Sequence, residues 1–194
     1  MVEAKPFALD GIASFGPLAG AAWHKAGLSL VTKAGHLLAC PGLEPEQGRW
    51  PCVQSAQLPL QQGARLAAAA ISEEEGHRTA ALLFEHIPGM ISIFKENLGS
   101  WSPAGEVHLP EAVGHVGLSF AGQELLAVIG KTGAVHRRHL EEGTTRWHAS
   151  PPLAQLPREF RSACMATTQE TSKGLLRLAL HKAHQAWVPE LTES

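Results

Sequence analysis

Four short apolar segments recur along this chain of 194 residues at an almost constant interval. The segments end at Trp23, Ile71, Phe120 and Thr168, so that successive ends lie 48, 49 and 48 residues apart. A repeat of this length indicates one supersecondary unit that is copied and packed against its neighbours, because a single unit cannot bury its own apolar face. The sequence therefore predicts an architecture of four related units.

Each unit continues with the same order of strands and turns. A second apolar segment ends in a turn that contains glycine in three units, for example Lys33-Ala34-Gly35 and Lys131-Thr132-Gly133. Glycine suits such turns because it adopts positive φ without a Cβ clash. The second strands are expected at residues 28–31, 79–84, 125–129 and 175–180, and third strands are clearest at 90–95 and 134–140. A fourth strand is expected where Gly and Trp stand close together, at 48–50, 99–101 and 143–147.

The predicted fold is all-β and β-propeller-like, a single domain of about four blades of roughly 48 residues each. The units are expected at residues 16–60, 61–111, 112–159 and 160–194, with 5–14 added to the last. In that last unit residues 7–12 would supply the fourth strand and close the ring. Ala, Gly and Ser dominate the first strands, which favours close approach around a narrow axis. The chain forms either a complete four-bladed ring or part of a larger ring that a second copy or a partner protein completes.

Composition places the chain among globular proteins and excludes some partners. Hydrophobic residues make up 44% of the chain and charged residues 18%, and the net charge is −2. This balance gives no electrostatic reason to expect nucleic acid or an anionic membrane. No apolar run of about 18 residues spans a membrane, and no secretory signal is visible at the start, so we expect an intracellular, cytoplasmic protein.

The chain has three cysteines, an odd number, and no two of them form a CxxC pair. In a reducing compartment we expect Cys40, Cys52 and Cys164 to be small buried hydrophobic residues without a covalent partner. A bridge between Cys40 and Cys52 on neighbouring strands is the alternative.

The third unit resembles a WD40-type repeat. Gly114-His115 precedes its first strand, Leu118–Phe120 ends that strand, and residues 122–129 followed by 132–135 match the usual second hairpin. Thr132 stands where the repeat has Asp, and His139-Leu140 stand where it ends in Trp-Asp. The resemblance is one of blade shape, and it implies a scaffold that binds a protein partner.

A second resemblance is to the fungal fucose-binding lectins. Their blades carry an aromatic residue after the inner strand, an Arg in the second strand, a Glu in the third and a Trp beyond. Arg177 matches the arginine, whereas the third unit has Leu126 there and Arg137 where the Glu belongs. The aromatic positions are matched by Trp23, Trp50, Trp101, Phe120 and Trp147. This resemblance implies a carbohydrate-binding protein.

No arrangement of residues points to catalysis, a metal or a cofactor. The closest histidine pairs, His136/His139 and His181/His184, lie three residues apart in or beside expected strands, so their side chains point to opposite faces. No HExxH, G-x-S-x-G or P-loop motif is present.

We therefore expect a non-catalytic protein that binds another protein or a second copy of itself, with a lectin as the alternative. The candidate binding residues are Trp23, Trp187, Arg177, Arg137 and Arg138, the last two forming a basic cluster with Lys131 nearby.

Overall fold

The computed structural model describes residues 8–24, 27–42, 49–74, 76–110, 114–140, 154–155, 165–170, 176–182, 185–187 and 190–191, and it describes side chains up to residue 140. Among these residues, no helix is long and apolar enough to cross a membrane. The regular structure is almost entirely β-strand, as the repeat predicts.

In the described part of the chain, four four-stranded sheets follow one another, and β1 (Ala8–Asp10) and β5 (Arg49–Pro51) form a further two-stranded sheet. We call the four-stranded sheets blades 1 to 4. Blade 1 comprises β2 (Leu18–His24), β3 (Gly27–Thr32), β4 (His36–Pro41) and β6 (Val53–Gln57). Blade 2 comprises β7 (Leu66–Glu74), β8 (His77–Phe84), β9 (Met90–Asn97) and β10 (Ser100–His108). Blade 3 comprises β11 (Val116–Ala121), β12 (Glu124–Ile129), β13 (Ala134–His139) and β14 (Ala154–Gln155). Blade 4 comprises β15 (Met165–Glu170), β16 (Leu176–Lys182), β17 (Gln185–Trp187) and β18 (Glu190–Leu191).

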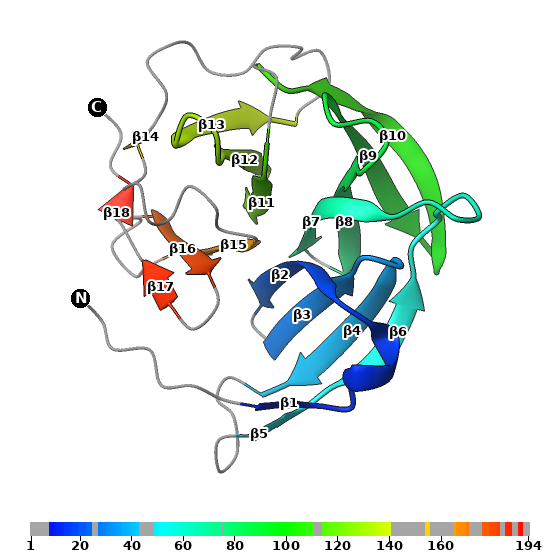
Figure 1. Ribbon diagram of the computed structural model, residues 1–194. Helices are drawn as coiled ribbons and strands as arrows, with labels where there is room; N and C mark the ends of the chain where they lie inside the picture. Colours follow the sequence, from blue (N-terminus) through cyan, green and yellow to red (C-terminus); the bar gives the residue numbers. More distant parts are fainter. Residues whose placement is uncertain are drawn as a thin grey trace.

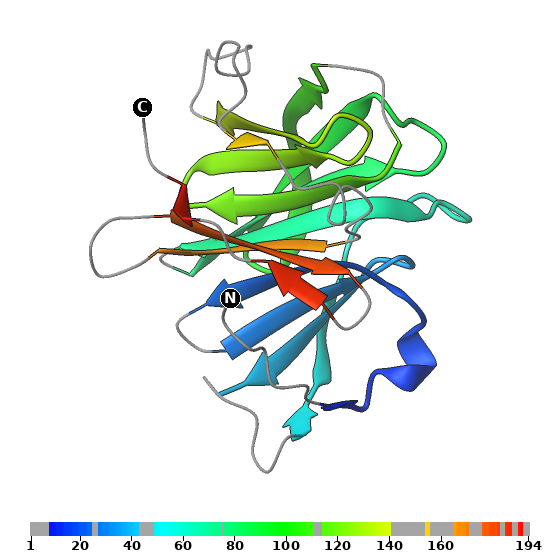
Figure 2. The same ribbon diagram turned by 60° about the vertical axis from the view of Figure 1, so that its left-hand side comes forward.

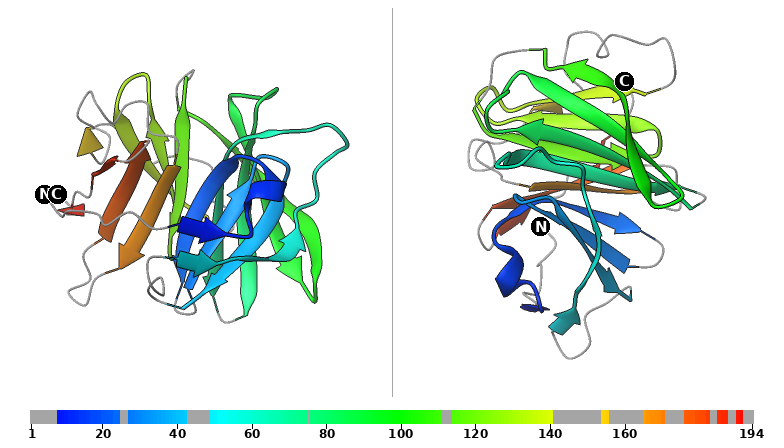
Figure 3. Two further views of the ribbon diagram at one scale, coloured as in Figure 1. Left: turned by 60° about the horizontal axis from the view of Figure 1, so that its bottom comes forward. Right: turned by 90° about the vertical axis from the view of Figure 1, so that its right-hand side faces the viewer.

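The four blades surround a common axis. The first strand of each blade, β2, β7, β11 or β15, lies innermost, and β10 lies at the outer edge of blade 2 (Figures 1 and 3). Each inner strand contacts the next, and β15 also contacts β2. Of the two arrangements that the sequence left open, the structure therefore shows the closed ring of four blades.

The inner strands approach each other very closely. A Cβ atom added at Gly20 of β2 would overlap the carbonyl oxygen of Ala69 in β7 and lie 2.8 Å from its carbonyl carbon. Ala19, Ala69 and Ala70 around this contact are almost completely buried. The small residues of the first strands are thus needed for the narrow axis, as the sequence predicts.

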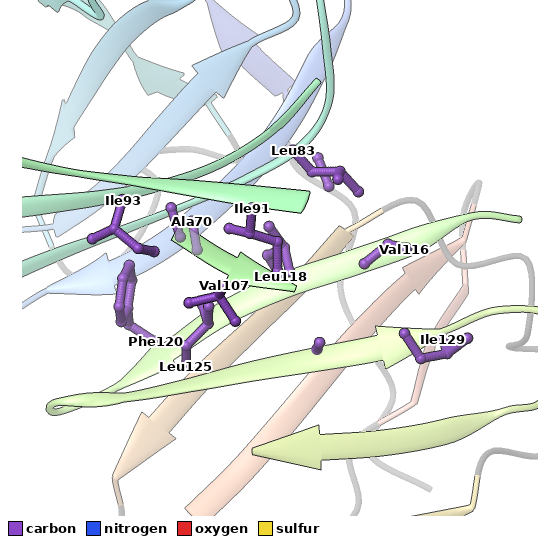
Figure 4. Close-up of a cluster of buried hydrophobic side chains, with 13 residues drawn as sticks. Ala70, Leu83, Ile91, Ile93, Val107, Val116, Leu118, Phe120, Leu125 and Ile129 are labelled. Atoms are coloured by element: carbon purple, nitrogen blue, oxygen red, sulfur yellow. The ribbon is translucent and has the colours of Figure 1, made fainter. Parts of the chain in front are cut away.

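Buried clusters lie between neighbouring blades, and another covers the face of blade 1 that is directed away from blade 2. Side chains of blade 2 and blade 3 form one buried cluster, in which Phe120 of β11 lies beside Ile93 of β9 (Figure 4). A second cluster joins Val31, Leu37 and Leu58 of blade 1 to the opposite face of blade 2. Strand alternation sends successive side chains of β8 to these two clusters in turn.

The first strand of the chain pairs with β5, beside blade 1, and not with a strand of blade 4. β1 (Ala8–Asp10) runs parallel to β5 (Arg49–Pro51), and the amide of Cys52 donates to the carbonyl of Asp10. β1 and the 3₁₀ turn η1 (Ala13–Phe15) lie on the outside of blade 1 (Figure 2). The prediction that residues 7–12 complete the last unit is therefore wrong. Parallel pairing with β5 satisfies the backbone groups of this segment instead.

The prediction that the fourth strand of the first unit begins at residues 48–50 is wrong, as the position of Trp50 shows. This residue lies in β5, it is completely buried, and its indole N–H donates to the carbonyl of Pro41 at 2.8 Å. The outer strand of blade 1 begins only at Val53. In blade 2 the prediction is confirmed, because β10 begins at Ser100 and includes Trp101. Residues 143–147 of the third unit lie outside the described part of the chain.

Cys40 and Cys52 form a disulfide, with their Cα atoms 4.2 Å apart. Both residues are buried, as expected, but they are not free thiols. The bridge joins the end of β4 to the segment between β5 and β6, beside the buried indole of Trp50. Of the two possibilities that the sequence left open, the structure shows the bridge between Cys40 and Cys52. Cys164 lies outside the described residues.

Candidate functional site

A row of polar and aromatic residues crosses the whole of blade 2 near one end of its strands. Glu73 of β7 is the register partner of Arg78 in β8, and Glu96 of β9 is the register partner of Trp101 in β10. Arg78 in turn bonds to Glu96. Cross-strand partners project from the same face of a sheet, so the four side chains lie side by side. We call Glu73, Arg78, Glu96 and Trp101 the polar row.

The centre of the polar row is a guanidinium held against a carboxylate. Nη2 of Arg78 donates to Oε1 of Glu96 at 2.7 Å, and Nε of Arg78 donates to Oε2. The side chain of Glu96 is 9% exposed and that of Arg78 is 23% exposed. This two-point geometry fixes both groups in one plane, because the guanidinium fork matches the two carboxylate oxygens. Arg78 has five N–H donors, of which the bonds to Glu96 use two; among the described residues no other acceptor takes the remaining three.

The indole of Trp101 completes this end of the row. The guanidinium carbon of Arg78 lies 5.9 Å from the centroid of the ring, within the range of a cation–π contact. Trp101 is half-buried and packs on the cluster that contains Leu37 and Leu58 of blade 1. The polar row therefore belongs to the face of blade 2 that is directed toward blade 1.

The opposing face of blade 1 carries small side chains at this level. Ser29 of β3 and Ala39 of β4 are register partners, and Val53 of β6 is the partner of Ala39. Val31 and Leu37, two residues away on the same strands, pack against blade 2, so Ser29 and Ala39 share that face. Ser29 and Ala39 are partly buried in the middle of the sheet, and Val53 on its outer strand is 63% exposed. The side chain of Val53 is therefore accessible to solvent on this face of blade 1.

His24 lies at the end of β2, next to the acidic end of the polar row. Among the residues that the structure describes, its buried Nε2 atom has no hydrogen-bond partner. Burial lowers the pKa of the imidazole, and the nearby carboxylate of Glu73 opposes that shift. The imidazole is therefore more readily neutral in the folded chain than in the unfolded chain.

This shift predicts that acid destabilises the fold through His24. Because the folded pKa is below the unfolded value of 6.5, the unfolded chain binds more protons as the pH falls through this range. Thermal unfolding measured between about pH 7.5 and about pH 5 should show a smaller loss of stability in His24→Gln than in the wild type. Equal losses in the two proteins would contradict the assignment.

The residues singled out from the sequence do not meet in one site. Trp23 is 37% exposed, as expected, but its ring lies 5.1 Å from that of Trp50, in the part of blade 1 that faces away from blade 2. Arg177 lies in β16 opposite Glu190 of β18, and Trp187 lies in β17 of blade 4. The side chains of these blade 4 residues are outside the described part of the structure.

The basic cluster in blade 3 is not an exposed patch. Arg138 is 7% exposed, and its burial lowers the pKa of the guanidinium. Arg137 is half-buried, with Nη1 at 3.7 Å from Oε2 of Glu124. Arg138 is therefore not exposed to an acidic partner, because the β13 strand turns it into the interior, and a contact of Arg137 with such a partner stays a prediction.

Sequence reasoning missed Arg78 and Glu96 because both lie just outside the expected strands. The second strand of this unit was expected at residues 79–84, whereas β8 begins at His77. The third strand was expected to end at 95, whereas β9 continues to Asn97. Among the described residues, no group of three or more His, Cys, Asp or Glu side chains is placed to hold a metal ion.

Comparison with known proteins gives a likeness of fold only. No family model matches the sequence, so the WD40 resemblance has no support there, and no curated protein matches it. Among solved structures, the computationally designed Ika4 protein is 10% identical with a TM-score of 0.44, covering 97% of this chain and 99% of that chain. The N224Q mutant of the Aleuria aurantia lectin in complex with alpha-methyl-L-fucoside is 16% identical with a TM-score of 0.41, covering 93% of this chain. This chain spans 63% of the length of that lectin.

Proposed function

We propose that this protein is a carbohydrate-binding β-propeller that acts by binding, with a sugar site between blades 1 and 2. The observation that carries the proposal is the geometry of Arg78, Glu96 and Trp101, which join a planar donor and acceptor pair to an aromatic ring. A sugar offers neighbouring hydroxyl groups that both donate and accept hydrogen bonds, together with an apolar face of C–H groups. The three side chains supply a partner for each of these groups.

The positions of the three residues also support a sugar ligand. They are an Arg in the second strand, a Glu in the third and a Trp in the fourth strand of one blade. These are the residue types and strands that the resemblance to the fungal fucose-binding lectins implies, although on a different blade from Arg177. Of the two binding functions that the sequence suggested, the polar row favours a glycan over a protein partner.

The disulfide supports a location outside the cytoplasm, where a protein can encounter glycans. Bridges such as Cys40–Cys52 persist in oxidising compartments and are rare in the cytosol. The proposed location is therefore extracytoplasmic, in place of the cytoplasm that the sequence suggested.

A glycan array tests the proposed function. We expect the wild-type protein to bind a group of glycans that share one terminal sugar, and Arg78→Ala to bind them at least tenfold more weakly, which corresponds to about 1.4 kcal/mol. Arg49→Ala is the matched control. It removes the same charge, but Arg49 is 73% exposed and lies on β5, outside the proposed site.

Two results would contradict the proposal. One is an array without any bound glycan. The other is a folded Arg78→Ala variant that binds as the wild type does, since the ion pair with Glu96 would then serve only the stability of blade 2.

A further inference from the structure

A pocket of about 550 Å³ opens at the other end of blade 1, where β2 begins. Its walls come from three separate segments: η1 with the two residues after it, the turn between β3 and β4, and the linker from β6 to β7. The lining includes Phe15, Lys33, Gln57, Leu60, Gln61 and Arg65. Lys33 directly follows Thr32 at one end of β3, whereas His24, which is near Glu73 of the polar row, pairs with Gly27 at the other end of that strand. The two sites are therefore separate.

Backbone hydrogen bonds hold the walls of this pocket in place. The carbonyl of Gly35 accepts from the amide of Leu58 at 2.9 Å, and the carbonyl of Lys33 accepts from the amide of Leu66 at 3.0 Å. The carbonyl of Arg65 accepts from the amide of Glu85 at 3.0 Å. The linker is thus fixed to blade 1 and to blade 2, which reduces the entropy lost when a ligand binds.

Side chains add to this rigidity and shape the floor. Nε2 of Gln57 donates to the carbonyl of Ala34 at 3.1 Å. Leu60 covers Gly35 so closely that a Cβ at Gly35 would lie 2.6 Å from its Cδ1 atom. The ring of Phe15 packs edge-on against His36, with the centroids 5.1 Å apart. An apolar wall and an apolar floor therefore stand beside polar groups held at fixed positions.

The pocket carries an excess of positive charge. Nζ of Lys33 lies 2.8 Å from Oε1 of Glu85, and both side chains are partly exposed. The pKa of the Glu85 carboxyl is lowered chiefly by the hydrogen bond from Lys33, with a further contribution from Arg65. Lys33 pairs with the Glu85 carboxylate, and Arg65 adds a second cation to the lining of the pocket, so the three groups together carry one positive charge.

We propose that this pocket binds a small hydroxylated molecule with a single carboxylate, such as a sugar acid. Lys33 and Arg65 hold the carboxylate, the glutamine side chains bond to its polar substituents, and Phe15 and Leu60 cover its apolar face. One carboxylate matches the single positive charge that remains beside Glu85. The volume is within the range that small-molecule sites occupy.

Glucuronate and glucose test this proposal, because they differ in having a carboxylate or a hydroxymethyl group on the same ring. Each is titrated into the whole isotope-labelled chain at constant ionic strength, and the amide resonances of Ala34, Gly63 and Ala64 are followed by NMR. We expect saturable shifts with glucuronate that glucose does not produce. Lys33→Gln combined with Arg65→Gln should weaken glucuronate binding at least tenfold, whereas Arg49→Gln, which removes an exposed charge elsewhere, should not.

Trp101→Ala separates this site from the proposed glycan site and should leave the glucuronate shifts unchanged. The proposal is overturned if glucuronate gives no saturable shift or if glucose binds equally well. It is also overturned if Arg49→Gln weakens binding as much as the double variant does, because the charge effect would then be general.

Discussion

Gly20→Ala should destabilise the protein by about 3 kcal/mol or more, or prevent it from folding. The added methyl group would overlap the carbonyl oxygen of Ala69, and that oxygen belongs to the backbone of the neighbouring inner strand. Relief of the overlap would have to separate β2 from β7 and thereby open the ring at its axis. Urea unfolding followed by far-UV circular dichroism measures the effect.

Gly89→Ala is the matched control for this substitution. Gly89 has no positive φ, and a Cβ there would meet no atom of the described residues within 4 Å. A surface change of this kind alters stability by no more than about 0.5 kcal/mol. If Gly20→Ala were as stable as Gly89→Ala, the close approach of the inner strands, and with it the four-bladed ring, would be wrong.

Loss of the Cys40–Cys52 bridge should lower the free energy of unfolding by about 3 kcal/mol, because the bridge closes a loop with a sequence separation of 12. The same change removes a constraint beside the completely buried Trp50. Thermal unfolding of the wild type with and without a reductant, and of a double Cys40→Ala, Cys52→Ala variant, measures the effect.

A thiol count provides the check on this prediction. The chain contains three cysteines, so the protein prepared without reductant should show one reactive thiol after denaturation, that of Cys164. The Cys164→Ala variant should then show none and should lose stability with reductant as the wild type does. Three reactive thiols in the unreduced wild-type protein would contradict the bridge.

The order of strands follows from the sequence because the repeat is read from whole units rather than from local propensity. The ends of the four first strands, at an almost constant spacing, locate β2, β7, β11 and β15. The high content of Ala and Gly in these strands, which a local reading would assign to helix or turn, is explained by the contact between Gly20 and Ala69. Glycine turns such as Lys33–Gly35 place the hairpins correctly, with Gly35 at a φ of 83°.

The features that the sequence did not reveal depend on contacts between distant segments. The parallel pairing of Ala8 with Arg49 has no signal in the local sequence. The three cysteines are compatible with free thiols as well as with a bridge between Cys40 and Cys52. The burial of Arg138 could not be foreseen, since charged residues near the outside of a sheet are normally solvated. Strand ends are set by cross-strand partners, which is why Arg78 and Glu96 fell outside the expected boundaries of β8 and β9.

The most direct test of a sugar site between blades 1 and 2 is the indole N–H resonance of Trp101, assigned with a Trp101→Phe variant. The chain has five tryptophans, of which Trp50 is completely buried with its N–H bonded to Pro41 and Trp23 lies on the other face of blade 1. On titration with the best glycan from the array, we expect a saturable shift of the Trp101 resonance that Arg78→Ala abolishes. A bound glycan that shifts the resonance of Trp23 and leaves that of Trp101 unchanged would contradict it.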